Sequence, residues 1–187
     1  MDALLTTFVS AFLAEWGDRT QLVVAMLAAT TRRPATVLAA LILAALASNV
    51  VAAIAGVYIA GTVNIRAMTL LTAMALLFAG ASGLIRRREP KARAPRRLLL
   101  ASAFILLLAA ELGDRTQFLT FALAGRFDSA PLAAAGATFG MIAACVPAAM
   151  LGDRLTRAVP VSAIRYGVAA VFLVAGFIVA VQALQLA

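Results

Sequence analysis

The chain has 187 residues, of which 64% are hydrophobic and only 13% are charged. Soluble domains are near half apolar and a quarter charged, so this composition excludes a water-soluble globule and a disordered chain and predicts a protein dissolved in lipid. The chain still carries a formal net charge of +8, from 16 basic and 8 acidic residues. That charge favours either basic loops at a membrane surface or an anionic partner such as nucleic acid.

Six apolar segments follow one another along the chain, each long enough to cross a bilayer as a helix. Their expected ranges are 3–29, 35–60, 66–85, 98–124, 131–152 and 162–185. Between the third and fourth segments lies a linker that holds seven basic residues and two prolines, a composition typical of a solvated loop. It contains no aromatic side chain for stacking on bases, so we expect no nucleic-acid partner. The predicted fold is an all-α, polytopic membrane protein.

The basic residues are distributed very unevenly between the loops. Twelve lie in the loops after the first, third and fifth segments, if Arg165 is counted with them, and two, Arg66 and Arg126, lie in the other loops. Because cytoplasmic loops carry the excess of Lys and Arg, this predicts a cytoplasmic linker and both termini on the non-cytoplasmic side. Fifteen arginines and one lysine indicate a bacterial chain, so we expect a multi-pass protein of the inner membrane.

One seven-residue motif occurs twice, at an offset of 96 residues. The first copy spans residues 15–21 (EWGDRTQ) and the second spans 111–117 (ELGDRTQ), with six of seven residues identical. A ridge of small residues follows at the same offset, and we expect it to serve close helix packing. The ridge consists of Ala40, Ala44, Ser48, Ala52 and Gly56, matched by Gly136, Gly140, Ala144, Ala148 and Gly152. Asn49, beside this ridge, is expected to form hydrogen bonds between helices.

The repeat divides the chain into a first three-helix repeat at 1–85, a basic cytoplasmic linker at 86–97 and a second three-helix repeat at 98–187. Since each repeat has an odd number of spans, the second must be inverted relative to the first. Six transmembrane helices in two inverted repeats are typical of secondary transporters, whose binding sites lie near the midplane where the repeats meet.

Both motifs place charged residues near the middle of a predicted span. A charge at that depth costs at least about 2.5–3.5 kcal/mol, so it is rarely kept without pairing or function. The charged residues concerned are Glu15, Asp18, Arg19, Glu111, Asp114 and Arg115.

Helical spacing predicts structural ion pairs within each motif. Glu15 and Arg19 are four residues apart and would share one side of a helix, and Glu111 and Arg115 repeat that spacing. These pairs do not include the aspartate of either motif. We therefore expect the two aspartates to be functional.

The motifs together also predict a site for a divalent cation. Four carboxylates and two guanidiniums sum to −2, which one divalent ion would neutralise. The chain has no histidine and a single cysteine, Cys145, so the donors are oxygen atoms, which suit Ca²⁺, Mn²⁺ or Mg²⁺ rather than Zn²⁺ or Cu⁺. Possible further ligands are Thr20, Gln21, Thr116 and Gln117.

Two further expectations concern how this site would work. Gly17 and Gly113 weaken each helix beside the acids, and a local unwinding there would free backbone carbonyls as ligands. After the cation leaves, the same carboxylates can carry protons. Competition between a divalent cation and protons for one set of acids is the minimal chemistry of an antiporter, and we expect no cofactor besides the transported ions.

Two complete copies of Glu-x-Gly-Asp-Arg-Thr in a six-span chain with inverted halves resemble the calcium/manganese:proton antiporter family. That family includes Golgi ion-homeostasis proteins and bacterial manganese exporters, and the resemblance covers nearly the whole chain. It implies a transporter rather than an enzyme, with Glu15, Asp18, Glu111 and Asp114 as ligands. It also implies export of Mn²⁺ or Ca²⁺ from the cytosol in exchange for protons or Na⁺.

Two other classes use the same residues. A passive cation channel would use the same acids, but an open pore does not require inverted halves. An intramembrane aspartyl enzyme would use Asp18 and Asp114 as an acid–base pair, but it has no need of the repeated glutamates, arginines and threonines. Since one chain carries both motifs, a monomer can form a complete site, and both a monomer and a homodimer stay open.

Overall fold

The structure is a computed structural model that describes residues 1–85, 98–152 and 160–184. These residues form eight helices and no strand, in agreement with the expected all-α class. The helices are α1 (Asp2–Glu15), α2 (Arg19–Thr31), α3 (Pro34–Ala60), α4 (Ile65–Leu84), α5 (Leu99–Glu111), α6 (Arg115–Phe127), α7 (Ala130–Leu151) and α9 (Val161–Leu184). The basic linker 86–97 lies outside the described residues, as do Arg154 and Arg157 of the loop after the fifth segment.

The helices correspond to the six predicted segments with one correction. Helices α3, α4, α7 and α9 are each long and apolar enough to cross a membrane. The segments expected at 3–29 and 98–124 are each divided into two shorter helices, α1 with α2 and α5 with α6. The division falls within the charged motif in both cases, so these segments are broken in the middle. The arrangement as six spans in two inverted repeats stays a prediction.

Short polar or cyclic residues set the boundaries between segments. Helix α2 ends at Arg32, whose φ of 56° is left-handed, and Pro34 begins α3, where its missing N–H costs no hydrogen bond. The side chain of Asn64 accepts a hydrogen bond from the backbone N–H of Ala67 and so caps α4. Helix α6 continues past its expected end at 124, because the left-handed residue that ends it is Asp128.

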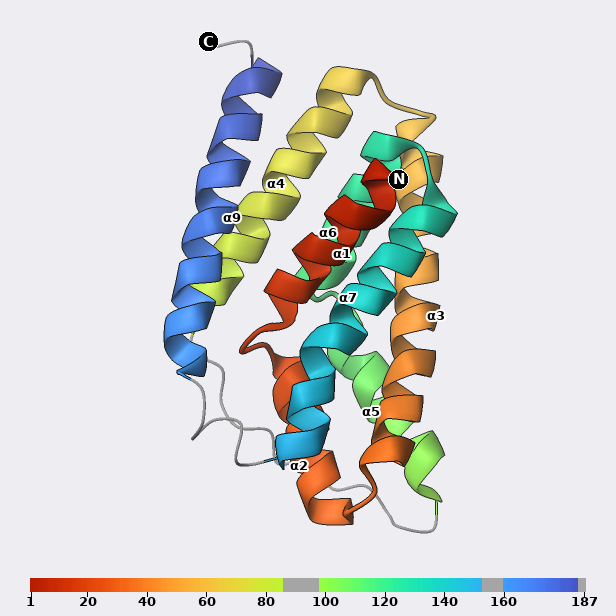
Figure 1. Ribbon diagram of the computed structural model, residues 1–187. Coiled ribbons are helices and arrows are strands. Elements are labelled where there is room, and N and C mark those ends of the chain that lie inside the picture. The colour runs from red at the N-terminus through yellow and green to blue at the C-terminus, as the bar shows by residue number, and fades with distance from the viewer. Residues whose placement is uncertain (86–97, 153–159, 185–187) are drawn as a thin grey trace.

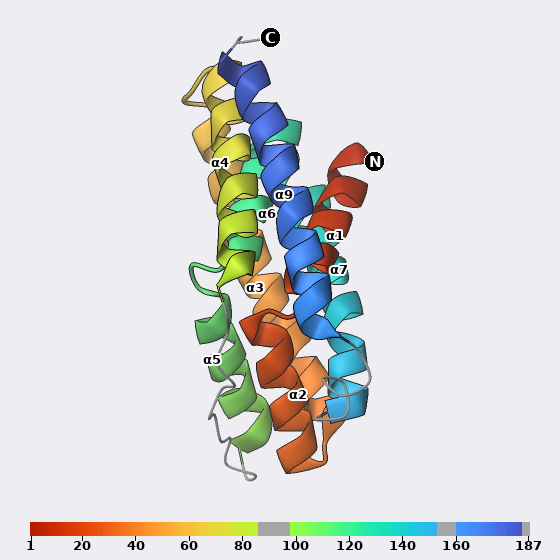
Figure 2. The ribbon, with the colours of Figure 1, turned by 90° about the vertical axis from the view of Figure 1, so that its left-hand side faces the viewer.

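The eight helices form two halves stacked along the long axis of the molecule (Figures 1 and 2). Helices α1 and α6 lie in one half, together with the ends of the chain, and α2 and α5 lie in the other. Helices α3 and α7 run through both halves, while α4 and α9 pack side by side and flank α1 and α6. The two breaks therefore lie where the halves meet.

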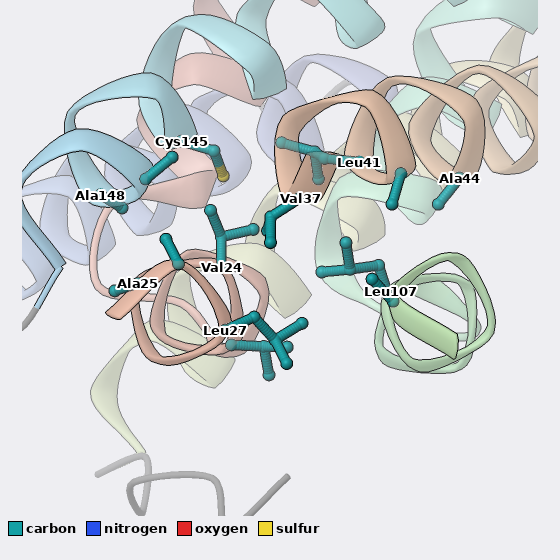
Figure 3. Close-up of a cluster of buried hydrophobic side chains, with 14 of the residues drawn as sticks. Val24, Ala25, Leu27, Val37, Leu41, Ala44, Leu107, Cys145 and Ala148 are labelled. Atoms are coloured by element: carbon teal, nitrogen blue, oxygen red, sulfur yellow. The ribbon is translucent and has the colours of Figure 1, made fainter. Parts of the chain in front are cut away.

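Each half has its own apolar core. In the half that contains α2 and α5, the core includes Leu27, Leu41, Leu107 and Cys145 (Figure 3). In the other half, α1, α4, α6 and α9 supply a smaller cluster that includes Phe172. Large apolar side chains also cover much of the outer surface, which is the pattern of a protein surrounded by lipid.

The ridge of small residues serves close helix packing, as predicted. A Cβ atom on Gly56 would overlap the backbone carbonyl of Phe121 in α6. Likewise, a Cβ on Gly140 in α7 would overlap the backbone carbonyl of Phe8 in α1. Backbones can approach this closely only where no side chain intervenes.

Adding a single methyl group to this ridge should destabilise the protein. We expect Gly56→Ala to lower the thermal unfolding midpoint in detergent, because overpacking costs about 1–3 kcal/mol. The control is Gly167→Ala in α9, where no atom of residues 1–85, 98–152 or 160–184 contacts the new Cβ within 4 Å. Alanine favours a helix over glycine by up to about 1 kcal/mol, so this variant should unfold at the same or a higher temperature. Equal midpoints for the two variants would contradict the close approach of α3 and α6.

Candidate cation-binding site

The first motif folds as a tight turn between α1 and α2. The backbone carbonyl of Glu15 accepts a hydrogen bond from the N–H of Asp18 at 3.1 Å. Trp16 has φ −67° and ψ 118°, and Gly17 has φ +72°. These values are those of a type II β-turn, which needs a positive φ at its third residue and therefore favours glycine there.

The second motif forms the same turn between α5 and α6. The Glu111 carbonyl accepts from the Asp114 N–H at 3.0 Å, Leu112 has φ −61° and ψ 117°, and Gly113 has φ +75°. The unwinding that we hypothesised at the two glycines is therefore present in both repeats. The Glu-x-Gly-Asp pattern specifies the turn as well as its acids.

The turn puts each acid at a helix end. Glu15 and Glu111 are the last residues of α1 and α5, while Asp18 and Asp114 are the N-cap residues of α2 and α6. Helix C-termini carry partial negative charge and N-termini partial positive charge. The aspartates are thus stabilised as anions by the helices that follow them. The glutamates add to the negative ends of α1 and α5, and together these groups attract a cation.

Two hydrogen bonds join the motifs of the two repeats. The Thr20 hydroxyl donates to Oε1 of Glu111 at 2.7 Å, and the Thr116 hydroxyl donates to Oε1 of Glu15 at 2.7 Å. The two glutamates are completely buried. Their second oxygen atoms, Oε2, have no hydrogen-bond partner within the described ranges. Each glutamate is thus held by one oxygen and keeps a buried oxygen for another ligand.

The glutamines of the motifs hold the turns. The N–H of Gly17 donates to Oε1 of Gln21 at 2.9 Å, and the N–H of Gly113 donates to Oε1 of Gln117 at 2.9 Å. Gln21 also donates from Nε2 to the carbonyl of Ala144 in α7 at 2.8 Å. Both glutamine oxygens are therefore engaged with the backbone of their own repeat.

The acids of the two turns converge. One carboxylate oxygen from each of Glu15, Asp18 and Asp114 lies within 4.8 Å of the others. Asp18 is 1% exposed and Asp114 is half-buried, while Glu111 is linked to this group through Thr20. Carboxylates at such separations repel one another strongly where water is excluded, so the cluster requires compensating positive charge.

The arginines are not arranged as predicted. Arg115 is 1% exposed, and its Nη2 lies 3.3 Å from Oδ1 of Asp18, in the other repeat. Arg19 is exposed, whereas Glu15 is completely buried. The expected pairs of Glu15 with Arg19 and of Glu111 with Arg115 assumed an uninterrupted helix, and the turn removes the spacing on which they depended.

A family model described as the divalent cation/proton antiporter GDT1 matches the chain twice, over residues 3–91 and 99–187. The chain belongs to the GDT1 divalent cation/proton antiporter family. Members of this family are transporters and not enzymes, so the aspartyl enzyme considered above is excluded. Each of the two matches contains one copy of the acidic turn, so the family model describes the repeat itself.

One relative of this GDT1-family protein is the "Putative manganese exporter" of Vibrio cholerae serotype O1 (strain ATCC 39541 / Classical Ogawa 395 / O395). The two chains are 31% identical over 175 residues, which cover 92% of this chain and 88% of the relative. No solved structure matches the chain.

One buried charge of this GDT1-family protein was assigned wrongly from the sequence. Arg165, counted with the cytoplasmic loops, lies in α9 and is 7% exposed. It packs against the first turn, with Cβ and Cδ 3.2 and 3.4 Å from the position that a Cβ would take on Gly17. The available signal was Pro160, directly before the first residue of α9, which marks a helix start and places Arg165 in its second turn.

Asn49 has the packing role that we expected. Its amide donates to the hydroxyl of Thr138 in α7 at 3.3 Å and accepts from the hydroxyl of Thr120 in α6 at 3.2 Å. These bonds connect α3 to α6 and to α7. Both ends of the side-chain amide are therefore used between helices.

Arg115 should contribute far more to stability than Arg19. Arg115→Gln removes the cation beside buried Asp18, and breaking a buried ion pair costs about 3–5 kcal/mol. Arg19→Gln changes an exposed side chain, so we expect an effect within about 0.5 kcal/mol. The yield of monodisperse protein and the thermal unfolding midpoint in detergent measure both. Similar losses in the two variants would argue against the arrangement of arginines described here.

Proposed function

We propose that the protein exports Mn²⁺ or Ca²⁺ from the cytosol in exchange for protons, with Na⁺ as the alternative counter-ion, by alternating access at a midplane carboxylate site. The observation that carries this proposal is the meeting of acids from two matching turns in one cluster. Membrane transporters use broken helices in the same way, because helix ends and unwound backbone at the midplane bind ions.

The proposed ligands are Glu15, Asp18, Glu111 and Asp114. Each glutamate keeps one buried oxygen atom, and carboxylate oxygens of Glu15, Asp18 and Asp114 lie within 4.8 Å of one another. The hydroxyls of Thr20 and Thr116 retain lone pairs and are possible further ligands. We assign Gln21 and Gln117 to positioning, because their oxygen atoms already accept hydrogen bonds from the turn glycines.

The donor set supports a hard divalent cation as the substrate. Carboxylate and hydroxyl oxygens suit Mn²⁺, Ca²⁺ and Mg²⁺, whereas Zn²⁺ and Cu⁺ favour imidazole or thiolate. Cys145 belongs to the apolar core of the half that contains α2 and α5. The Vibrio cholerae relative is named as a manganese exporter, which favours Mn²⁺ within this group.

Exchange follows from the cost of buried charge. When the cation leaves, the carboxylates lose most of their compensation, and a cluster in this state is expensive to keep in a membrane. Protons, or Na⁺, restore the balance and allow the empty site to return. The same acids then serve the cation in one direction and the counter-ion in the other.

The two repeats have different surroundings, which supports alternating access. The first turn is covered by α9, since Val161 and Arg165 contact Gly17, whereas no atom of the described residues lies within 4 Å of the Cβ position on Gly113. Helix α4 packs on α6, but the equivalent pair, α9 and α2, has no comparable contact among the described residues. In an inverted repeat, exchanging the two environments opens the site to the other side.

The proposal includes a location and an assembly state. A bacterial relative and the distribution of basic residues favour the inner membrane, with the linker in the cytoplasm and both termini outside. Because the bonds from Thr20 to Glu111 and from Thr116 to Glu15 close within one chain, a monomer is the proposed functional unit. A homodimer of two such sites is the alternative.

Neutralising either aspartate should abolish transport. Asp18→Asn and Asp114→Asn preserve volume but remove a charged ligand, so cells sensitive to Mn²⁺ should lose the tolerance that the wild-type protein gives them. Asp2→Asn at the start of α1 is the matched control and should retain tolerance. Membrane levels of each variant are measured in parallel by immunoblot. Wild-type tolerance with either site variant would contradict a direct role for that aspartate.

Coupling to protons separates the antiporter from a channel. In proteoliposomes we expect an imposed proton gradient to accelerate Mn²⁺ movement in the opposite direction, and Mn²⁺ addition to move protons detectably with a pH-sensitive dye. Asp114→Asn should lose both signals. Mn²⁺ flux that is unaffected by proton and Na⁺ gradients would indicate the channel instead.

A further inference from the structure

We propose that Arg165 is a positioning residue of the cation site, which sets the charge balance of the carboxylate cluster and thereby the affinity for the divalent ion. This inference rests on the proposed function of that cluster. It adds a residue from outside the repeated motif, carried by the last helix of the chain.

The placement of α9 brings this arginine to the site. Val161 and Arg165 are one turn apart on α9, and both contact the position of a Cβ on Gly17, at 3.0 and 3.2 Å. The aliphatic stem of Arg165 therefore lies along the turn that holds Asp18. A side chain larger than hydrogen at Gly17 would push α9 away, so the turn and the arginine fit each other.

The side chain of Arg165 is buried, and the described residues satisfy its polar atoms only in part. The Arg165 side chain is 7% exposed, and its Nε has no hydrogen-bond partner in the part of the chain that the structure describes. Its Cζ lies 5.1 Å from the centre of the Tyr166 ring, a cation–π contact that supplies only part of what water would. Because its stem lies against the turn that holds Asp18, the proposed source of compensating charge is the anionic cluster of the two turns.

When only the buried charges are counted, Arg165 replaces Arg19 as the second positive charge of the cluster. Four carboxylates with Arg115 and Arg165 sum to −2, whereas Arg19 is exposed and drops out of the count. One divalent cation then brings the cluster to neutrality. Without Arg165 the cluster would carry −3 and would stay negative after the divalent ion had bound.

Only the second repeat carries an arginine at this position. At the offset of 96 the residue equivalent to Arg165 is Thr69, whose hydroxyl accepts a hydrogen bond from Arg126 at the surface. Within the part of the chain that the structure describes, no atom lies within 4 Å of the Cβ position on Gly113, so none of these residues covers the second turn as α9 covers the first. Arg165 therefore acts from the side of the first turn.

We expect the charge of Arg165 to weaken binding of the divalent cation and to speed its release. Removing one positive charge near the site strengthens the attraction for a divalent cation and slows its departure. Arg165→Gln should lower the half-saturating Mn²⁺ concentration roughly tenfold and reduce the maximal rate by a similar factor. Arg165→Lys keeps the charge and should restore both values to within about threefold of wild type.

The test uses the full-length protein in proteoliposomes, with Mn²⁺ flux measured against Mn²⁺ concentration, and equilibrium Mn²⁺ binding in detergent. Arg33→Gln removes one positive charge from an exposed loop and serves as the control, for which we expect wild-type values. A variant of opposite sign, Val161→Lys, adds a cation beside Gly17. It should raise the half-saturating concentration roughly tenfold, and it is informative even if Arg165→Gln does not fold.

The outcomes separate the two proposals. Wild-type protein that neither binds nor moves Mn²⁺ or Ca²⁺ would overturn the proposed function. If the wild type transports Mn²⁺ but the half-saturating concentration is unchanged in Arg165→Gln and Val161→Lys, the role of Arg165 is overturned and the residue only supports packing. Opposite shifts in those two variants, with rescue by Arg165→Lys, support it.

Discussion

Several carboxylates are held together inside a region that excludes water, and the surrounding residues stabilise each carboxylate by a different contact. The helices are broken so that Asp18 and Asp114 lie at helix N-termini, where peptide dipoles stabilise an anion. Threonines satisfy one oxygen of each glutamate, and Arg115 lies beside Asp18. These contacts leave part of the negative charge uncompensated. A transported cation or its counter-ions must neutralise that remainder.

The contacts also explain why the site exists only where two repeats meet. Neither repeat satisfies its own glutamate, because each Glu Oε1 accepts from the threonine of the other repeat. The pairing of Arg115 with Asp18 crosses the same boundary. A relative movement of the repeats therefore changes ligands and hydrogen-bond donors together, which is how a conformational change acquires a preference for one charge state.

Much of this site was predictable, and the residues that were missed have a common cause. The duplicated motif identified the four acids, and glycine between Glu and Asp indicated unwinding, because these features are local in sequence. The partner of Arg115 was not predictable, and Pro160 indicated that Arg165 lies in a helix but not that its side chain is buried. A turn resets the face on which every following residue lies, so spacing rules fail across it. The height at which α9 packs along the molecule depends on tertiary contacts, and no pattern within 161–184 encodes it.

The spacing of acids within each repeat is fixed, whereas the separation between the repeats can change, and this difference affects which ion fits the site. Within each repeat the spacing of Glu and Asp is fixed by the turn hydrogen bonds of 3.1 and 3.0 Å and by a glutamine that binds the turn glycine. Between the repeats, the separation depends on side-chain hydrogen bonds and on the close packing of α3 with α6 and of α7 with α1. Ca²⁺ accepts longer bonds and more ligands than a smaller divalent ion that needs near-octahedral geometry. The site can therefore adapt to ion size by moving one repeat against the other. On this proposal, the choice of ion depends on the packing of α3, α6 and α7 around the turns as well as on the acids that both ions share.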